Sequence, residues 1–245
     1  MMKPGLFLDF DGVLFDSVQE GFVVSTSALD PSISFKEVAL NSPDYDAFSK
    51  FRYLIGPAWQ YYILIQLLKK NTTFTDEAFS LLVSQGPSKE AQNFEENFYQ
   101  ARRSLRCSFY DYWIDLHKPF SFFFWIKERY EALKDFLYII TTKDESAVLS
   151  LLKNQGLSFS SDRLYDKDKV KHFGSKKAVI EHIQASLKID SSIFIDDSYQ
   201  HTRCFNADSN VSVLIPNWGY VSPSALTQSE QEICTAIDNF FNGNS

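Results

Sequence analysis

The chain has 245 residues, of which 44% are hydrophobic and 22% charged, so it can bury a sizeable core as one large domain or two small ones. Its net charge of -7 argues against nucleic acid as a partner, and no apolar run reaches the roughly 18 residues that a membrane span needs. The first strand signal leaves no room for a signal peptide, and the three cysteines are widely spaced, so we expect a reduced, soluble, cytoplasmic protein.

The first predicted element is a short apolar strand, Leu6–Leu8, which stops at the carboxylates of Asp9 and Asp11. A run this apolar is typical of a parallel sheet that is covered on both faces. Carboxylates at the end of a buried strand are costly unless a cation or hydrogen-bond donors meet them, and the carboxyl ends of parallel strands are where ligands bind. We therefore interpret the two aspartates as functional, against the alternative of an ordinary strand end with solvated side chains.

Helical patterning then dominates, with almost no strand signal before residue 119. The apolar spacing predicts helices over 47–70, with an interruption at Gly56-Pro57, over 75–85, and over 88–115 as one or two helices. We expect residues 18–118 to form a helical domain inserted into an α/β domain made of residues 1–17 and 119–245.

The alternation of helices and strands returns after Pro119. Helices are predicted over 122–133, 144–154, 175–187 and 229–241, strands over 136–140, 192–195 and 211–215, and a short strand is a candidate at 163–165. This order predicts an α/β fold with a Rossmann-like, doubly wound parallel sheet.

Polar residues follow three of the apolar strands. They are Asp9 and Asp11, Thr141 and Thr142, and Asp196 and Asp197. Parallel strands place their carboxyl ends on one edge, so we expect these side chains to converge. A hard divalent cation would relieve the repulsion among the carboxylates, and all-oxygen ligation favours Mg²⁺. With a lysine from the start of the next helix, such a site suits a phosphoryl group.

Four short motifs surround these strand ends. They are Asp9-Phe10-Asp11-Gly12-Val13, Ile139-Ile140-Thr141-Thr142-Lys143, Gly174-Ser175-Lys176-Lys177 and Ile193-Phe194-Ile195-Asp196-Asp197-Ser198. Through them the chain resembles the haloacid dehalogenase superfamily, within which it is similar to phosphoglycolate phosphatases and β-phosphoglucomutases. The resemblance covers residues 5–16 and 120–220. It implies a phosphatase that hydrolyses a small phosphate monoester.

The resemblance also implies catalytic roles. Asp9 would be the nucleophile that forms an aspartyl-phosphate, and Asp11 the general acid and then the base for water. Thr141 would hydrogen-bond the phosphoryl oxygens, and Lys176 would steady Asp9 and the phosphate. We prefer Lys176 to Lys177, because apolar residues then follow three, four and seven positions later.

The implied cofactor is Mg²⁺, held by Asp9, Asp196, Asp197 and the main-chain carbonyl of Asp11. Asp197 aligns better than Asp196 with the principal metal ligand of the superfamily. Three positions depart from the usual pattern: Val13 replaces a common Thr, Thr142 a common Asn, and His201 a further Asp. The paired acid Asp196 would compensate for the last of these.

The helical insert resembles the C1 cap of the superfamily, with hinges at Asp16-Ser17 and Lys118-Pro119. Such a cap favours small, soluble phosphate esters. Gly56, like Thr142, is a candidate substrate-binding residue. An arginine cluster either binds an anionic substrate tail or forms a solvated helix face; it comprises Arg102, Arg103 and Arg106. The alternative functions are a phosphomutase of the β-phosphoglucomutase type and a non-catalytic binding module, and the oligomeric state stays open.

Overall fold

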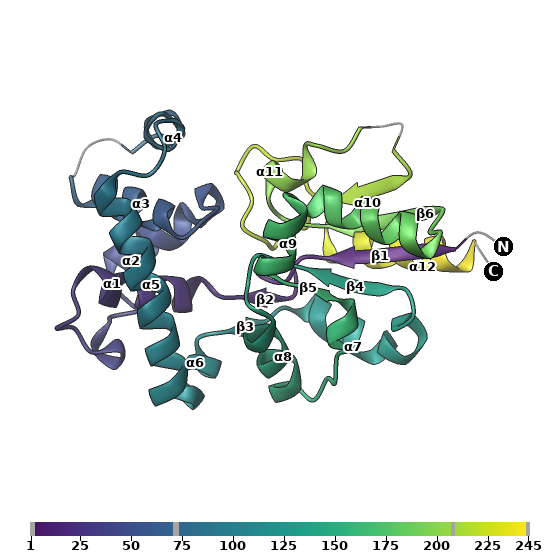
Figure 1. Ribbon diagram of the computed structural model, residues 1–245, viewed down its shortest axis with the longest axis horizontal. Helices are drawn as coiled ribbons and strands as arrows, with labels where there is room; N and C mark the ends of the chain where they lie inside the picture. Colours follow the sequence, from purple (N-terminus) through teal and green to yellow (C-terminus); the bar gives the residue numbers. More distant parts are fainter. Residues whose placement is uncertain (1–2, 71–73, 207–208, 244–245) are drawn as a thin grey trace. The chain divides into compact units, whose positions relative to one another are not determined.

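The computed structural model describes residues 3–70, 74–206 and 209–243. The chain divides into two compact units (Figure 1). The first, here called the α/β unit, comprises Met1–Asp16 and Lys118–Ser245. The second, the helical unit, comprises Ser17–His117. Within the part of the chain that the structure describes, no helix combines the length and the apolar character needed to cross a bilayer.

The α/β unit is built on a five-stranded sheet with the order β5-β4-β1-β6-β7. Its strands are β1 (Pro4–Leu8), β4 (Leu137–Ile140), β5 (Leu164–Tyr165), β6 (Ser191–Ile195) and β7 (Val211–Leu214). Every pairing is parallel. The chain runs outward from the central β1 to one edge and then returns to build the other side, which makes the sheet doubly wound. The predicted fold class is therefore confirmed.

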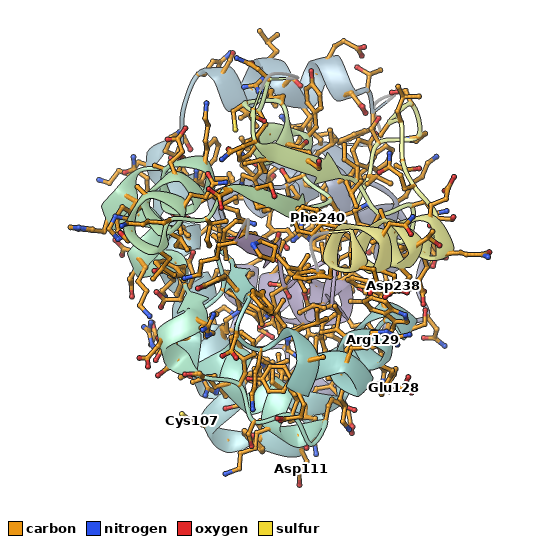
Figure 2. All side chains as sticks on the ribbon, turned by 90° about the vertical axis from the view of Figure 1, so that its right-hand side faces the viewer. Cys107, Asp111, Glu128, Arg129, Asp238 and Phe240 are labelled. Carbon is orange, nitrogen blue, oxygen red and sulfur yellow. The ribbon has the colours of Figure 1, made fainter. Side chains whose placement is uncertain are left out.

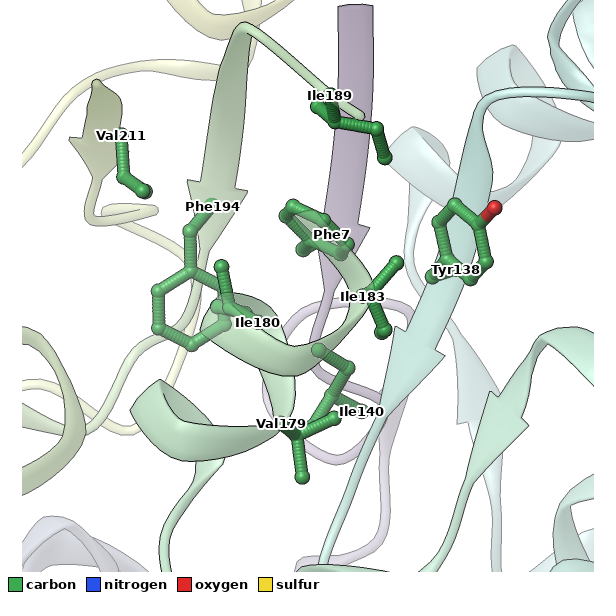
Figure 3. Packing of buried hydrophobic residues seen from close by; sticks show 9 residues of the cluster. All are labelled: Phe7, Tyr138, Ile140, Val179, Ile180, Ile183, Ile189, Phe194 and Val211. Atoms are coloured by element: carbon green, nitrogen blue, oxygen red, sulfur yellow. The ribbon is translucent and has the colours of Figure 1, made fainter. Parts of the chain in front are cut away.

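Helices lie between these strands along the chain, and one more helix follows the last strand. They are α7 (Ser121–Leu133), α8 (Glu145–Asn154), α9 (Lys167–Phe173), α10 (Lys176–Leu187), α11 (Tyr199–Thr202) and α12 (Glu230–Asn242). Figure 3 shows how α10 covers the sheet: Ile180 and Ile183 pack with Phe7 of β1, Tyr138 of β4 and Phe194 of β6. On α12, the Asp238 carboxylate lies 3.9 Å from Arg129 Nε of α7 (Figure 2). The buried faces of these helices fix the strand ends in place.

Two short helices of the α/β unit, α9 and α11, were not predicted from the sequence. No helix was predicted over α9, because its sequence KDKVKHF has only two apolar residues. These two, Val170 and Phe173, pack against the core cluster beneath α10. Asp166 caps the helix by accepting a hydrogen bond from the Lys169 amide, and Gly174 ends it in a left-handed conformation. Caps at both ends and two anchoring contacts suffice for this short helix.

The helical unit contains six helices among its described residues. They are α1 (Val18–Leu29), α2 (Pro43–Lys50), α3 (Trp59–Lys69), α4 (Asp76–Ser84), α5 (Lys89–Ser108) and α6 (Tyr110–Asp115). The predicted interruption at Gly56-Pro57 lies between α2 and α3, and the break also holds the 3₁₀ turn Arg52–Leu54. Aromatic rings form the core: Tyr61 stacks between Phe48 and Phe98, with centroids 5.3 and 5.4 Å away.

Arg102 follows neither of the two expectations for the arginine cluster. Its Nε donates to Glu20 Oε1 at 2.6 Å, and its Nη2 donates to Glu20 Oε2 at 2.7 Å. The guanidinium also lies 4.7 Å from the centroid of the Phe98 ring. Arg106 lies 5.1 Å from the Trp113 ring, and Arg103 is exposed. Arg102 is therefore a structural cation that joins α5 to α1.

Candidate active site

Two acidic residues meet at the carboxyl ends of the central strands. Asp9 follows β1, and its amide donates to the Ile195 carbonyl of β6 at 2.9 Å. Asp196 directly follows β6, and because Leu8 of β1 is in register with Ile195 of β6, Asp9 and Asp196 lie on neighbouring strand ends. On the other side of β1, the Thr141 amide donates to the Tyr165 main-chain carbonyl at 2.8 Å. This bond holds Thr141 at the end of β4. The parallel sheet thus brings the predicted strand-end residues to one edge.

Lys176 connects the two acids. Its Nζ lies 2.7 Å from Asp9 Oδ2 and 2.7 Å from Asp196 Oδ2, and the residue is 2% exposed. Lys176 opens α10, where the Ser175 hydroxyl caps the helix by accepting from the Ala178 amide. Lys177 points elsewhere, since its Nζ donates to the Cys204 carbonyl. Of the two candidate lysines, the structure places Lys176 among the acids.

The electrostatic balance differs between the two acids. Burial raises the pKa of Asp9, the nearby Asp196 adds to this, and Lys176 offsets only part, so the pKa of Asp9 is about 6. Burial also acts to raise the pKa of Asp196, but Lys176 and His201 outweigh it and lower that pKa to about 2. Burial disfavours the charged form of Lys176, yet the two carboxylates raise its pKa overall. Lys176 therefore remains a cation between its partners.

Asp196 has two further contacts. The Ser198 amide donates to Asp196 Oδ1 at 2.8 Å, and His201 Nδ1 lies 3.1 Å from Oδ2. His201 belongs to α11, which begins directly behind this strand end. Ligand atoms of Asp9, Asp196 and His201 all lie within 4.8 Å of one another. His201 is thus a neighbour of the acidic pair.

Two glycines leave room for Asp197: Gly12 of the first motif, and Gly219, which the sequence analysis did not single out. A Cβ on Gly12, whose φ is +86°, would lie 1.9 Å from Asp197 Oδ2, and a Cβ on Gly219 would lie 2.5 Å from Asp197 Cβ. The Tyr220 amide donates to Asp197 Oδ2 at 2.6 Å. Nearby, Trp218 Nε1 donates to the Val13 carbonyl at 3.1 Å. The segment after β7 therefore closes over the loop that follows β1.

Asp11 pairs with a lysine to which the sequence analysis gave no role. Lys143 Nζ donates to Asp11 Oδ1 at 3.0 Å, and the Lys143 side chain is 2% exposed. The signal available in the sequence was a lysine close behind a buried strand, at the same edge as the acids. Thr142, beside it, is exposed. Gly56 belongs to the helical unit, where its amide donates to Gln60 Oε1 at 2.6 Å.

The donor set fits a divalent cation. Four carboxylates lie along this edge against two ammonium groups, and those of Asp9 and Asp196 lie within 4.8 Å of each other and of a ring nitrogen of His201, so negative charge is in excess when all the acids are ionised. The carboxylates are those of Asp9, Asp11, Asp196 and Asp197, and the ammonium groups those of Lys143 and Lys176. A cluster of carboxylate oxygens is the ligand type that Mg²⁺ prefers, and a bound divalent cation would offset the excess.

Comparisons with known proteins identify the fold. No family model matches the sequence, and no curated protein matches it significantly. A predicted phosphoglycolate phosphatase from Haemophilus somnus 129pt matches the structure with a TM-score of 0.59 and 16% identity, covering 97% of this chain and 99% of that one. A predicted phosphatase from Clostridium acetobutylicum matches with a TM-score of 0.56 and 17% identity, covering 98% and 99%.

A third structure carries the family name. It is a haloacid dehalogenase-like family hydrolase from Streptococcus pneumoniae, with a TM-score of 0.52 and 20% identity, covering 96% of this chain and 98% of that one. These matches span both units, the inserted helices included. The chain therefore has the fold of the haloacid dehalogenase-like hydrolases, and the predicted resemblance is confirmed at the level of the fold.

Proposed function

We propose that the protein is a Mg²⁺-dependent phosphatase that hydrolyses a small phosphate monoester through an aspartyl-phosphate on Asp9. The observation that carries the proposal is the buried arrangement of Lys176 at 2.7 Å from both Asp9 and Asp196. A buried carboxylate at a strand end, fixed by a cation that also meets a second acid, suits nucleophilic attack on phosphorus. The fold shared with hydrolases supports this reading.

The first step uses two acids. A carboxylate oxygen of Asp9 attacks phosphorus as the bond from phosphorus to the leaving oxygen breaks. Asp11 donates its proton to that oxygen, so the alcohol departs neutral. Lys176 offsets the charge on the phosphoryl oxygens, and the Thr141 hydroxyl donates a hydrogen bond to one of them.

In the second step a water molecule attacks phosphorus. Asp11, now a carboxylate, takes the proton from this water, and the bond between Asp9 and phosphorus breaks. Inorganic phosphate leaves, while Asp9 is ionised again and Asp11 protonated for the next turnover. The atoms and charges therefore balance over the cycle.

Asp9, Asp196, Asp197 and the main-chain carbonyl of Asp11 would hold Mg²⁺. When bound, the ion supplies positive charge to the phosphoryl oxygens and keeps Asp9 ionised. The helical unit would act as a cap that admits small esters, with Gly56 and Thr142 contacting the substrate. Such a cap excludes water during transfer and readmits it for hydrolysis.

The test is hydrolysis of p-nitrophenyl phosphate with and without Mg²⁺. We expect turnover that requires Mg²⁺ and is abolished in Asp9→Asn. The matched control is Asp162→Asn, which makes the same change at an exposed position of the α/β unit. Calorimetry measures Mg²⁺ binding separately. Phosphate transfer to a second substrate without net hydrolysis would indicate a mutase instead, and the absence of both turnover and Mg²⁺ binding would indicate a binding module.

A further inference from the structure

Lys143 is a buried cation to which the proposed mechanism gives no task. It lies three positions after Ile140, the last residue of β4, and its side chain is 2% exposed. Lysine is rarely buried without a partner, because removing its ammonium group from water is costly. The groups that this ammonium meets therefore indicate what the residue does.

The ammonium group meets the carboxylate of Asp11. Nζ lies 3.0 Å from Oδ1 and 3.4 Å from Oδ2, so both oxygens are in contact. Asp11 is the more exposed partner, with 20% of its side chain accessible. Lys143 thus holds Asp11 from the protein side, while part of the carboxyl group still faces solvent.

The backbone is held differently at Lys143 and at Asp11. The Lys143 amide donates to Thr141 Oγ1 at 3.1 Å, and its carbonyl accepts from the Lys167 amide at 3.2 Å, so the backbone is fixed on both sides. Asp11 lies in the loop after β1, next to Gly12 with its φ of +86°. A fixed cation beside a loop carboxylate restricts the positions that the carboxylate adopts.

We propose that Lys143 is a positioning residue for Asp11. It holds the carboxyl group where its proton reaches the leaving oxygen, and its charge stabilises the carboxylate that remains after the proton has moved. Lys143 acts through Asp11 and does not touch the reacting atoms. The inference rests on the proposed function, in which Asp11 is the general acid.

This role makes the effect of Lys143 depend on the leaving group. A 2,4-dinitrophenolate departs readily as an anion and gains little from a proton, whereas phenolate gains much more. Removing a residue that positions the acid should therefore spare the first substrate and slow the second. A role in folding or in binding the phosphate would affect both substrates alike, because both carry the same phosphate group.

The experiment compares kcat/KM for 2,4-dinitrophenyl phosphate and phenyl phosphate in the Mg²⁺-loaded enzyme. For Lys143→Met we expect a loss of about 100-fold on phenyl phosphate and less than about tenfold on the dinitrophenyl ester, since general acid catalysis contributes about 10²- to 10⁴-fold. Lys143→Arg keeps the charge and should recover part of the loss. If Lys143→Met does not fold, by circular dichroism, the same ratio is read from Lys143→Arg, where we expect a smaller shift in the same direction.

Asp11→Asn is the reference that separates the two proposals. It should show the same selective loss on phenyl phosphate, and equal losses on both esters would contradict the acid role itself. If Asp11→Asn is selective while the folded Lys143 variants lose both activities equally, Lys143 does not act through Asp11 and the inference is overturned.

Discussion

The two units bury charged side chains in opposite ways. In the helical unit, one acid faces one base: Glu20 and Arg102 make two hydrogen bonds at 2.6 and 2.7 Å. In the α/β unit, carboxylates outnumber ammonium groups at the strand ends, and Lys176 lies 2.7 Å from both Asp9 and Asp196. In the Glu20–Arg102 pair one positive charge offsets one negative charge, whereas an excess of buried negative charge calls for a further cation. The balance of charges, rather than their burial, separates the candidate active site from a structural ion pair.

We expect the largest effect on activity at Lys176, whose ammonium group contacts two acids. Replacing Lys176 by Met should lower kcat/KM for p-nitrophenyl phosphate by about 10²- to 10³-fold, because a preorganised charge beside the phosphoryl group is lost. Lys177→Met removes the same group one position later, where Nζ donates to the Cys204 carbonyl, and should leave activity near the wild-type value. Equal losses in the two variants would show that Lys176 has no special role.

The Glu20–Arg102 pair should contribute to the free energy of unfolding. Glu20→Gln removes the buried carboxylate that meets the half-buried Arg102, and we expect the free energy of unfolding to fall by about 3 kcal/mol in chemical denaturation. Replacing both residues by Met should recover much of this loss, because apolar side chains can take the place of a buried ion pair. Arg103→Met, at an exposed neighbouring position, should change stability by less than about 0.5 kcal/mol. A Glu20→Gln protein of normal stability would mean that the pair is worth no more than a surface contact.

The sequence predicts the parts of this comparison that follow from local patterns. The strands β1, β4, β6 and β7 are apolar runs, the first three with polar ends, and their parallel order predicts that Asp9 and Asp196 lie together. The helix α9 was missed because its stability depends on two apolar contacts and its caps. Arg102 was misjudged because Glu20 is 82 positions away, and nothing local indicates that pairing.

The segment after β7 illustrates the same limit. The Tyr220 amide and Gly219 contact Asp197 from a stretch without helix or strand periodicity, so its path depends on tertiary packing. Lys143 was missed for another reason, since a lysine just beyond a strand is ordinarily solvated. Patterns and the family resemblance thus predict the acids at the strand ends and Lys176, but not the role of Lys143 or the contacts of Gly219 and the Tyr220 amide.

Replacing a carboxylate by an amide should not lower the free energy of unfolding when the change is made at Asp9 in the α/β unit. With a chelator present at pH 8, Asp9→Asn should leave the free energy of unfolding unchanged or raise it by about 1 kcal/mol, because it removes a negative charge beside Asp196. The raised pKa of Asp9, about 6, points in the same direction. Above that pH the folded protein holds an ionised carboxylate that burial disfavours, and this charge lowers the free energy of unfolding. Denaturation of Asp9→Asn and Glu20→Gln side by side measures the contrast, and a loss near 3 kcal/mol in both would erase it.

The smallest expected effect is a difference in alkylation rate between a cysteine of each unit. Burial, and then the charge of Glu230, raise the pKa of Cys234 in α12 to about 11. A raised pKa keeps the thiol protonated, and the thiolate is the reactive form, so alkylation by iodoacetamide at pH 8 should be at least about tenfold slower at Cys234 than at the exposed Cys107 of α5. Because exposure alone also slows a reaction, the pH dependence decides the cause: labelling of Cys234, followed by mass spectrometry, should keep accelerating up to about pH 11. A rate that levels off near pH 9 would show that access, and not the charge state of the thiol, protects this cysteine.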